Sequence, residues 1–190
     1  CLTFLGGNAL AQDYLSALNE PGRTATAAEL SAWDIDVRPD FLGLPPGSGS
    51  VAQGEALWLD QCASCHGDFG DSNEVFSPIV LGNITEDDVR TGRVAALTDP
   101  SVVRTTFMKV ATLSTIWDYI NRAMPWNAPK SLAADEVYSL VAYLLNLAYI
   151  VDDDFVLSDE NMEDVQALMP NRNGMTEDHG LWSVNGVPDV

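Results

Sequence analysis

The feature that most constrains this chain is the pentapeptide Cys62-Ala63-Ser64-Cys65-His66. Two cysteines separated by two residues and followed at once by a histidine form the attachment pattern of a c-type haem. The two thiols add to the vinyl groups of the porphyrin as thioethers, and one helical turn can present both sulfurs to one porphyrin edge. The imidazole of His66 then serves as the proximal ligand of the iron. The sequence therefore predicts one covalent haem c, attached through Cys62 and Cys65 and ligated by His66.

Two other kinds of site also use a Cys-x-x-Cys pair. A structural zinc site needs four ligands, but the chain has no second cysteine pair and its only other histidine is His179. A thioredoxin-like redox pair lies beside a βαβ unit, and no such pattern surrounds residues 62–65. Haem attachment is therefore the favoured interpretation of the motif.

Met124 is the expected second axial ligand of the iron. Apolar periodicity predicts a helix over residues 112–123, and this helix must end before Pro125 because the residue that precedes a proline is disfavoured in the helical region. Met124 then begins an extended turn, from which its thioether can point back at the iron. Methionine is more often a core residue than a ligand. The four competitors, of which the first is the strongest, are Met108, Met162, Met169 and Met175.

Two helices are expected to cross near Gly54. Ser50 and Gln53 form a capping-box pattern at the start of the first helix, which leads into the haem motif. Gly54 has no side chain, so a second helix can approach its backbone closely. The strongest apolar stripe in the chain lies over residues 132–147 and predicts that second helix, with Ser131 as its N-cap.

The remaining predicted helices are shorter. Thr26 and Glu29 form another capping-box pattern. Ser158 is expected to cap a short amphipathic helix, and Tyr119 is expected on the apolar face of the helix that precedes Met124. The predicted fold class is all-α, with helices expected over residues 26–33, 50–62, 85–91, 112–123, 132–147 and 158–167.

Changes in composition along the chain predict four segments. Ala9-Leu10-Ala11 follows an apolar stretch and fits a signal-peptidase cleavage site, although a lipid-anchored Cys1 and a retained N-terminal arm are alternatives. Both extensions outside the haem domain either pack on that domain or lie on a partner subunit. The expected segments are a signal-peptide remnant over residues 1–11, an N-terminal arm over 12–49, the haem domain over 50–148 and a C-terminal extension over 149–190.

The charge of the chain restricts its partners. It carries 28 acidic and 9 basic residues, which gives a formal net charge of −19. Nucleic acid is an unfavourable partner because phosphate binding needs clustered Lys and Arg. No stretch is long enough for a membrane span. The acidic surface favours a cationic soluble protein, such as a small cytochrome, as electron acceptor, or serves only to maintain solubility. Because c-type haem is attached outside the cytoplasm, the protein is expected in the periplasm.

Two levels of resemblance follow from these motifs. Residues 51–148 resemble a class I cytochrome c, with a helix into the haem motif, a loop-rich middle, a methionine ligand and a terminal helix. The fuller chain resembles the cytochrome subunit of bacterial sulfane dehydrogenase, the SoxD type. The segments that carry this second resemblance are Trp33–Phe41, Gly43–Gly49, Trp117–Ile120, Arg122–Trp126 and Met169–Arg172.

The resemblance implies a fold and a function. It implies a class I cytochrome c domain with long, mostly irregular extensions, in which His66 and Met124 are the axial ligands and Cys62 and Cys65 hold the haem. In that family the cytochrome pairs with a molybdenum-cofactor subunit of the sulfite oxidase type. That subunit oxidises the sulfane sulfur of a cysteine persulfide on a carrier protein during periplasmic thiosulfate oxidation. The cytochrome is then a non-catalytic electron-transfer subunit.

One departure and three alternatives stand beside this interpretation. Many family members carry a second haem domain, whereas this chain has a single Cys-x-x-Cys-His motif. The first alternative is a periplasmic electron shuttle without a permanent partner. The second is a cytochrome subunit of another dehydrogenase, such as one that oxidises sulfite. The third is a haem enzyme such as a peroxidase, which would need an open position on the iron.

Overall fold

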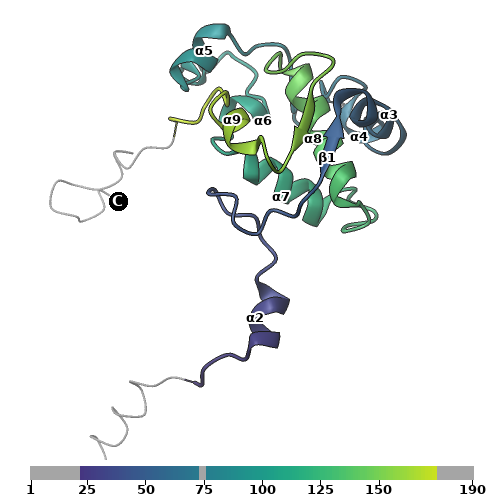
Figure 1. The fold of residues 1–190 in the computed structure, drawn as a ribbon. Helices are drawn as coiled ribbons and strands as arrows, with labels where there is room; N and C mark the ends of the chain where they lie inside the picture. The colour runs from purple at the N-terminus through teal and green to yellow at the C-terminus, as the bar shows by residue number, and fades with distance from the viewer. Residues whose placement is uncertain (1–21, 73–75, 175–190) are drawn as a thin grey trace, which may run out of the picture. The chain divides into compact units, whose positions relative to one another are not determined.

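A computed structural model describes residues 22–72 and 76–174 of the chain (Figure 1). The chain divides into two compact units, Cys1–Ile35 and Asp36–Val190. The expected signal remnant and Met175 lie outside the described residues. Residues 36–49, which the sequence groups with the N-terminal arm, belong to the larger unit.

The smaller unit contains helix α2, Ala27–Trp33. Its predicted capping box is confirmed, because the backbone N–H of Glu29 donates to the Thr26 hydroxyl while the Glu29 carboxylate accepts from the Thr26 N–H at 2.8 Å. No residue of α2 is buried.

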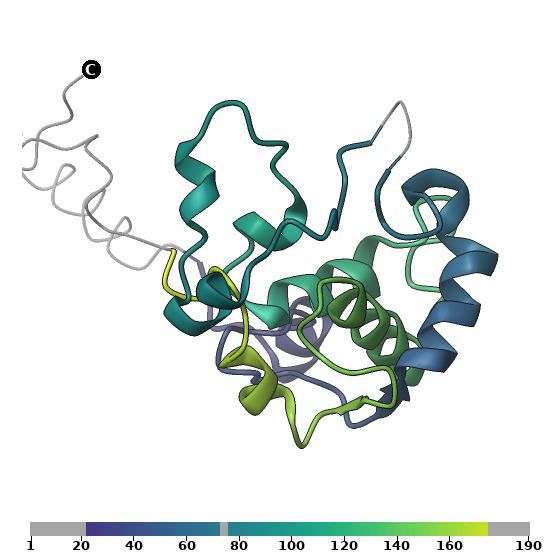
Figure 2. The same ribbon diagram turned by 90° about the horizontal axis from the view of Figure 1, so that it is seen from above.

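The larger unit is built on the crossing of α3, Val51–Gln61, with α8, Ala134–Leu147. Figure 2 shows α3 in blue beside α8 in green. The prediction that Gly54 marks this crossing is confirmed, since a Cβ there would overlap the carbonyl oxygen of Ser139 and lie 2.8 Å from the Cβ of Tyr143. The capping box of Ser50 and Gln53 is also present.

Helix α8 starts later than the sequence predicts. Lys130 has a left-handed backbone with φ of 63°, so the chain turns just before this helix. The backbone N–H of Ala133 donates to the Glu136 carboxylate at 2.7 Å, which caps the first turn without Ser131. Ser131 as N-cap was therefore wrong.

Helix α7, Leu113–Ala123, packs against α8 and ends at Met124. The expectation that Tyr119 lies on its buried face is wrong, because that side chain is 58% exposed. Trp117 is fully buried instead, with its ring centroid 5.5 Å from that of Tyr138. Burial of the Trp117 indole removes more apolar area from water than burial of the smaller Tyr119 ring would. This difference favours the helix rotation that buries Trp117.

A two-stranded antiparallel sheet joins β1, Ser48–Ser50, to β2, Val156–Ser158. Ser158 pairs with Ser48 and is therefore not a helix cap, so that prediction was wrong. The following helix α9, Met162–Gln166, starts after Asn161, whose side-chain oxygen accepts from the Ser158 N–H at 2.8 Å.

The described part of the C-terminal extension packs on the same core as α3 and α8. Four of its apolar side chains are buried there: Leu157, Met162, Val165 and Met169. The middle of the unit is mostly loop and holds three short elements. These are α5, Glu86–Thr91, the 3₁₀ helix Ala95–Thr98, and α6, Thr106–Lys109.

Candidate haem and electron-transfer site

The two haem-motif cysteines lie on one short helical turn. Cys62 ends α3 by donating its N–H to the Trp58 carbonyl at 2.8 Å, and it begins the single-turn helix α4, Ala63–His66. The N–H groups of Cys65 and His66 both donate to the Cys62 carbonyl, at 3.1 and 3.0 Å. Neither cysteine is in a disulfide. The structure therefore brings together the three motif residues that the sequence predicted.

The His66 imidazole is close to two aromatic rings. Its centroid is 5.8 Å from that of Trp58 and 5.5 Å from that of Phe76. Burial lowers the pKa of His66, which favours the neutral imidazole. Nδ1 is buried and finds no hydrogen-bond partner among the described residues. Neutral imidazole is the form that binds a metal.

Two aromatic side chains hold the backbone that follows His66. The Trp58 Nε1–H donates to the Gly67 carbonyl at 2.9 Å, and the Tyr143 hydroxyl donates to the Asp68 carbonyl at 3.1 Å. The two rings also contact each other, with centroids 6.0 Å apart. The hydrogen bonds from these two side chains to this loop carry no local sequence signal.

The environment of Cys62 suits a thioether better than a thiolate. Burial, and then the nearby Cys65, raise the pKa of the Cys62 thiol to about 11. A buried site disfavours the charged form of a thiol, whereas a thioether carries no charge. Cys65 is exposed. Both sulfurs are therefore compatible with covalent haem attachment.

The donor set fits haem and does not fit zinc. Within residues 22–72 and 76–174, no group of three His, Cys, Asp or Glu side chains could hold a metal ion. A structural zinc site would need two ligands beyond the cysteine pair. A single Cys-x-x-Cys pair and one histidine, whose lowered pKa favours the neutral form, lie on one turn. These are the residues that hold a c-type haem.

The four methionines in the described part of the chain differ in their surroundings. Met124 is half-buried at the end of α7, and its backbone is extended with φ −115° and ψ 148°. Met108 is fully buried, and its sulfur accepts a hydrogen bond from the Asn83 Nδ2–H at 3.0 Å. Met162 and Met169 are fully buried in the core. Among these four, only the Met124 thioether is not enclosed by the protein core, so Met124 stays the predicted ligand.

The C-terminal extension closes the ends of helices in the loop-rich middle. The Arg172 guanidinium donates to the carbonyls of Val89 and Arg90, at 2.5 and 3.2 Å, at the C-terminus of α5. Asn173 donates its backbone N–H to the Gly92 carbonyl at 2.8 Å. A cation at a helix C-terminus is favoured by the helix dipole. The sequence predicts a turn here and shares it with a family, but it does not predict that Arg172 caps α5.

Two side-chain amides of the same extension cap the end of α6 and the start of α7. The Asn171 Nδ2–H donates to the Lys109 carbonyl at 3.0 Å. The Gln166 side chain accepts from the Leu113 N–H at 2.7 Å and donates to the Ala111 carbonyl at 3.0 Å. The segment between His66 and the Met124 helix is therefore fixed by residues that lie beyond α8.

Further hydrogen bonds link α6 to the loop after the haem motif. The Phe107 N–H donates to the Ile79 carbonyl at 3.2 Å, and the Ile79 N–H donates to the Gly70 carbonyl at 2.8 Å. Gly70 in turn donates to the Gly67 carbonyl at 3.3 Å. These bonds give the loop-rich segment a fixed backbone next to His66.

The chain resembles known proteins in sequence and in fold. The family model for cytochrome C oxidase, cbb3-type, subunit III, matches residues 49–144. The chain is also similar to the crystal structure of the sulfane dehydrogenase SoxCD from Paracoccus pantotrophus. The sequences are 41% identical, the match covers 83% of this chain and 71% of that chain, and the TM-score is 0.69. A search of the curated proteins finds no match.

No helix in the described part of the chain combines the length and the apolar character that a membrane span needs.

Proposed function

We propose, from the premise that this chain belongs to the SoxD-type cytochrome c subunits of sulfane dehydrogenase, that it carries electrons away from a molybdenum-cofactor subunit in the periplasm. That partner oxidises the sulfane sulfur of a carrier-bound cysteine persulfide. The cytochrome passes the electrons to a soluble acceptor. The observation that carries this proposal is a haem-attachment turn with a half-buried His66, whose lowered pKa favours the neutral imidazole, in a chain 41% identical to a SoxCD structure.

The residues of this chain have distinct roles in that function. Cys62 and Cys65 would hold one haem c as thioethers, and His66 and Met124 would ligate its iron. When bound, this haem supplies a one-electron couple. A thioether is a weak donor, so the His–Met pair gives a higher potential than two histidines would. Trp58 and Phe76 orient the His66 ring and shield it from water.

Ligation of the iron by two protein residues would argue against chemistry there. A peroxidase needs an open coordination position, whereas His66 and Met124 together would leave none. The chain is therefore proposed as a non-catalytic electron-transfer subunit. Oxidation of the sulfur compound then belongs to the partner.

The net charge of −19 supports a cationic acceptor. Complementary charge raises the rate of encounter between an acidic and a basic protein, and the effect weakens as salt increases. A small basic cytochrome has the required chemistry.

The decisive experiment is to purify the cytochrome from its native host under conditions that keep complexes intact. We expect haem iron and molybdenum in the same fraction, and haem reduction when a persulfide-bearing carrier protein is added. A homogeneous monomer without molybdenum would instead identify a free electron shuttle. Haem reduction by sulfite and not by the persulfide would identify a sulfite-oxidising complex.

A further inference from the structure

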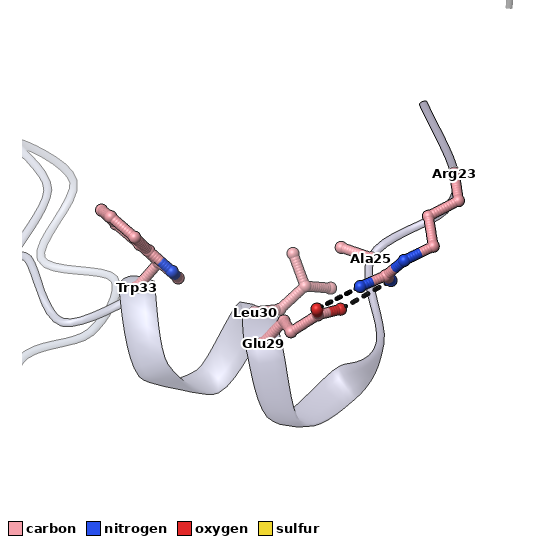
Figure 3. A pocket seen from close by; sticks show the side chains of 5 residues that line it. All are labelled: Arg23, Ala25, Glu29, Leu30 and Trp33. Atoms are coloured by element: carbon pink, nitrogen blue, oxygen red, sulfur yellow. Dashed lines mark hydrogen bonds and ion pairs between the residues drawn. The ribbon is translucent and has the colours of Figure 1, made fainter. Parts of the chain in front are cut away.

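Helix α2 exposes its apolar side chains to solvent. Trp33 is 87% exposed and Leu30 is 58% exposed. The two residues are three positions apart, so they lie on one face of the helix. Figure 3 shows both side chains projecting from α2, with Leu30 beside Ala25 and the Arg23–Glu29 pair. Nothing in the described part of this unit covers that face.

Local interactions hold this face in a defined shape. The Thr26–Glu29 capping box closes the first turn. Both terminal guanidinium nitrogens of Arg23 pair with the Glu29 carboxylate. An isolated helix of this length is marginal in water, so these contacts keep the apolar residues arranged for binding without burying them.

The exposed apolar area of Leu30 and Trp33 is the right size for a few central residues of a larger interface. A tryptophan can bury about 150–250 Å², whereas a stable interface buries about 800 Å² on each partner. Binding energy at such interfaces is concentrated in a few residues, with tryptophan the most enriched. The Leu30–Trp33 face is therefore large enough for a hot spot and too small for an interface by itself.

Charge selects the kind of partner. Glu29 is neutralised by Arg23, whereas Asp34, which ends α2, forms no ion pair among the described residues. An acidic group beside an apolar face is complementary to an apolar pocket with a basic rim. A second copy of this chain fits poorly, because two molecules that each carry −19 repel one another.

The chain next to α2 is anchored to the larger unit. Val37 is buried, and its N–H donates to the Asp118 carboxylate at 3.2 Å. Only three residues separate it from Trp33. A partner that holds α2 is thus tethered to the unit that carries the haem motif.

We propose that the Leu30–Trp33 face of α2 docks into an apolar pocket with a basic rim on the molybdenum-cofactor subunit. This inference rests on the proposed function, since it takes its partner from there. It assigns to the N-terminal arm the role of a recruitment element.

The test uses the full-length haem-loaded cytochrome and the purified molybdenum subunit. Affinity is measured by calorimetry for the wild type and for Trp33→Ala and Leu30→Ala. Ser31→Ala is the matched control, because Ser31 is exposed on the same helix but off the apolar face. Hydrogen exchange of the α2 amides is followed with and without the partner.

We expect Trp33→Ala to weaken binding on the order of tenfold to a hundredfold, as for a hot-spot residue, and Ser31→Ala to bind like wild type. The α2 amides should exchange rapidly in the cytochrome alone and slowly in the complex. Wild-type binding together with unchanged Trp33→Ala and Leu30→Ala affinities would overturn the docking inference alone. Exchange of the α2 amides that does not change when the partner is added would also overturn it. Failure of wild type to bind the subunit would overturn both this inference and the proposed function.

Discussion

The Arg172 guanidinium donates to the Val89 carbonyl at 2.5 Å and joins two residues that are 83 positions apart. A third bond from the same group reaches the Met169 carbonyl at 3.0 Å. The cation therefore closes its own turn and the end of α5 at once.

Replacing Arg172 with alanine should destabilise the protein. It leaves partly buried carbonyls without donors, and each such loss costs about 1–3 kcal/mol. We expect a drop of about 2–4 kcal/mol in the free energy of unfolding, measured by denaturant titration of the haem-loaded protein. Arg90→Ala is the control, because it keeps the Arg90 carbonyl and removes a side chain that forms an exposed ion pair with Asp87, worth at most about 1 kcal/mol. Equal losses of stability in both variants would contradict the role of Arg172 in closing the end of α5.

Replacing Gly54 with alanine should separate α3 from α8. The added Cβ would overlap the Ser139 carbonyl oxygen, and no rotamer change can move a backbone atom. We expect a loss of about 3 kcal/mol or more, seen as a lower Tm and a lower yield of haem-loaded protein. Ala52→Ser, at an exposed position of the same helix, should cost about 0.5 kcal/mol or less. A small loss of stability in the Gly54→Ala variant would mean that the helices cross elsewhere.

Replacing Met124 with alanine should abolish the sulfur-to-iron charge-transfer band of the ferric protein. It should also lower the reduction potential, since a sulfur ligand is lost. The absorption spectrum and a redox titration measure both effects. Met108→Ala should keep the band while costing about 2–5 kcal/mol of stability through the cavity it leaves. Loss of the band in Met108→Ala would show that the axial ligand is Met108.

The Glu29 carboxyl should titrate far below its ordinary range. The ion pair with Arg23, followed by hydrogen bonds from Thr26, lowers its pKa from 4.5 to about 2. Because the folded pKa is depressed, the stabilisation of α2 is present above pH 4.5 and is lost as the pH falls through about 2. Carboxyl chemical shifts followed by NMR measure this midpoint. In Arg23→Ala the midpoint should rise toward the ordinary value, and an unchanged midpoint would exclude the ion pair.

Electron transfer to a cationic acceptor should slow as salt is added. The attraction of a protein with net charge −19 is screened over about 10 Å at 0.1 M ionic strength. Stopped-flow oxidation of the reduced cytochrome by a basic small cytochrome measures the effect. A neutral electron acceptor is the control and should show no such trend. A rate independent of salt with the basic acceptor would mean that the acidity serves solubility only.

Local patterns in the sequence predicted the parts of the structure that depend on neighbouring residues. The haem turn, both capping boxes that begin with Thr26 and Ser50, and the close approach at Gly54 each follow from a few adjacent side chains. The end of α7 before Pro125 does so as well. These features need no knowledge of distant contacts.

The errors arose where distant residues decide the outcome. Ser158 has the composition of a helix cap, but its backbone pairs with Ser48 from the other end of the unit. Tyr119 belongs to a plausible apolar stripe, but the burial of Trp117 against Tyr138 sets the rotation of the helix. The donor roles of Arg172 and Gln166 also depend on helices far away in the chain. None of these partners can be identified from local periodicity.

The apolar core continues past the cytochrome domain that the family model matches. That match ends at residue 144, whereas Leu157, Met162 and Met169 are fully buried in the same core. The region shared with other cytochromes is therefore shorter than the region that folds as one unit. A recombinant fragment cut at residue 144 would expose this apolar surface and leave the ends of α5 and α6 open. For protein engineering, the transferable module is the haem domain together with its C-terminal turn.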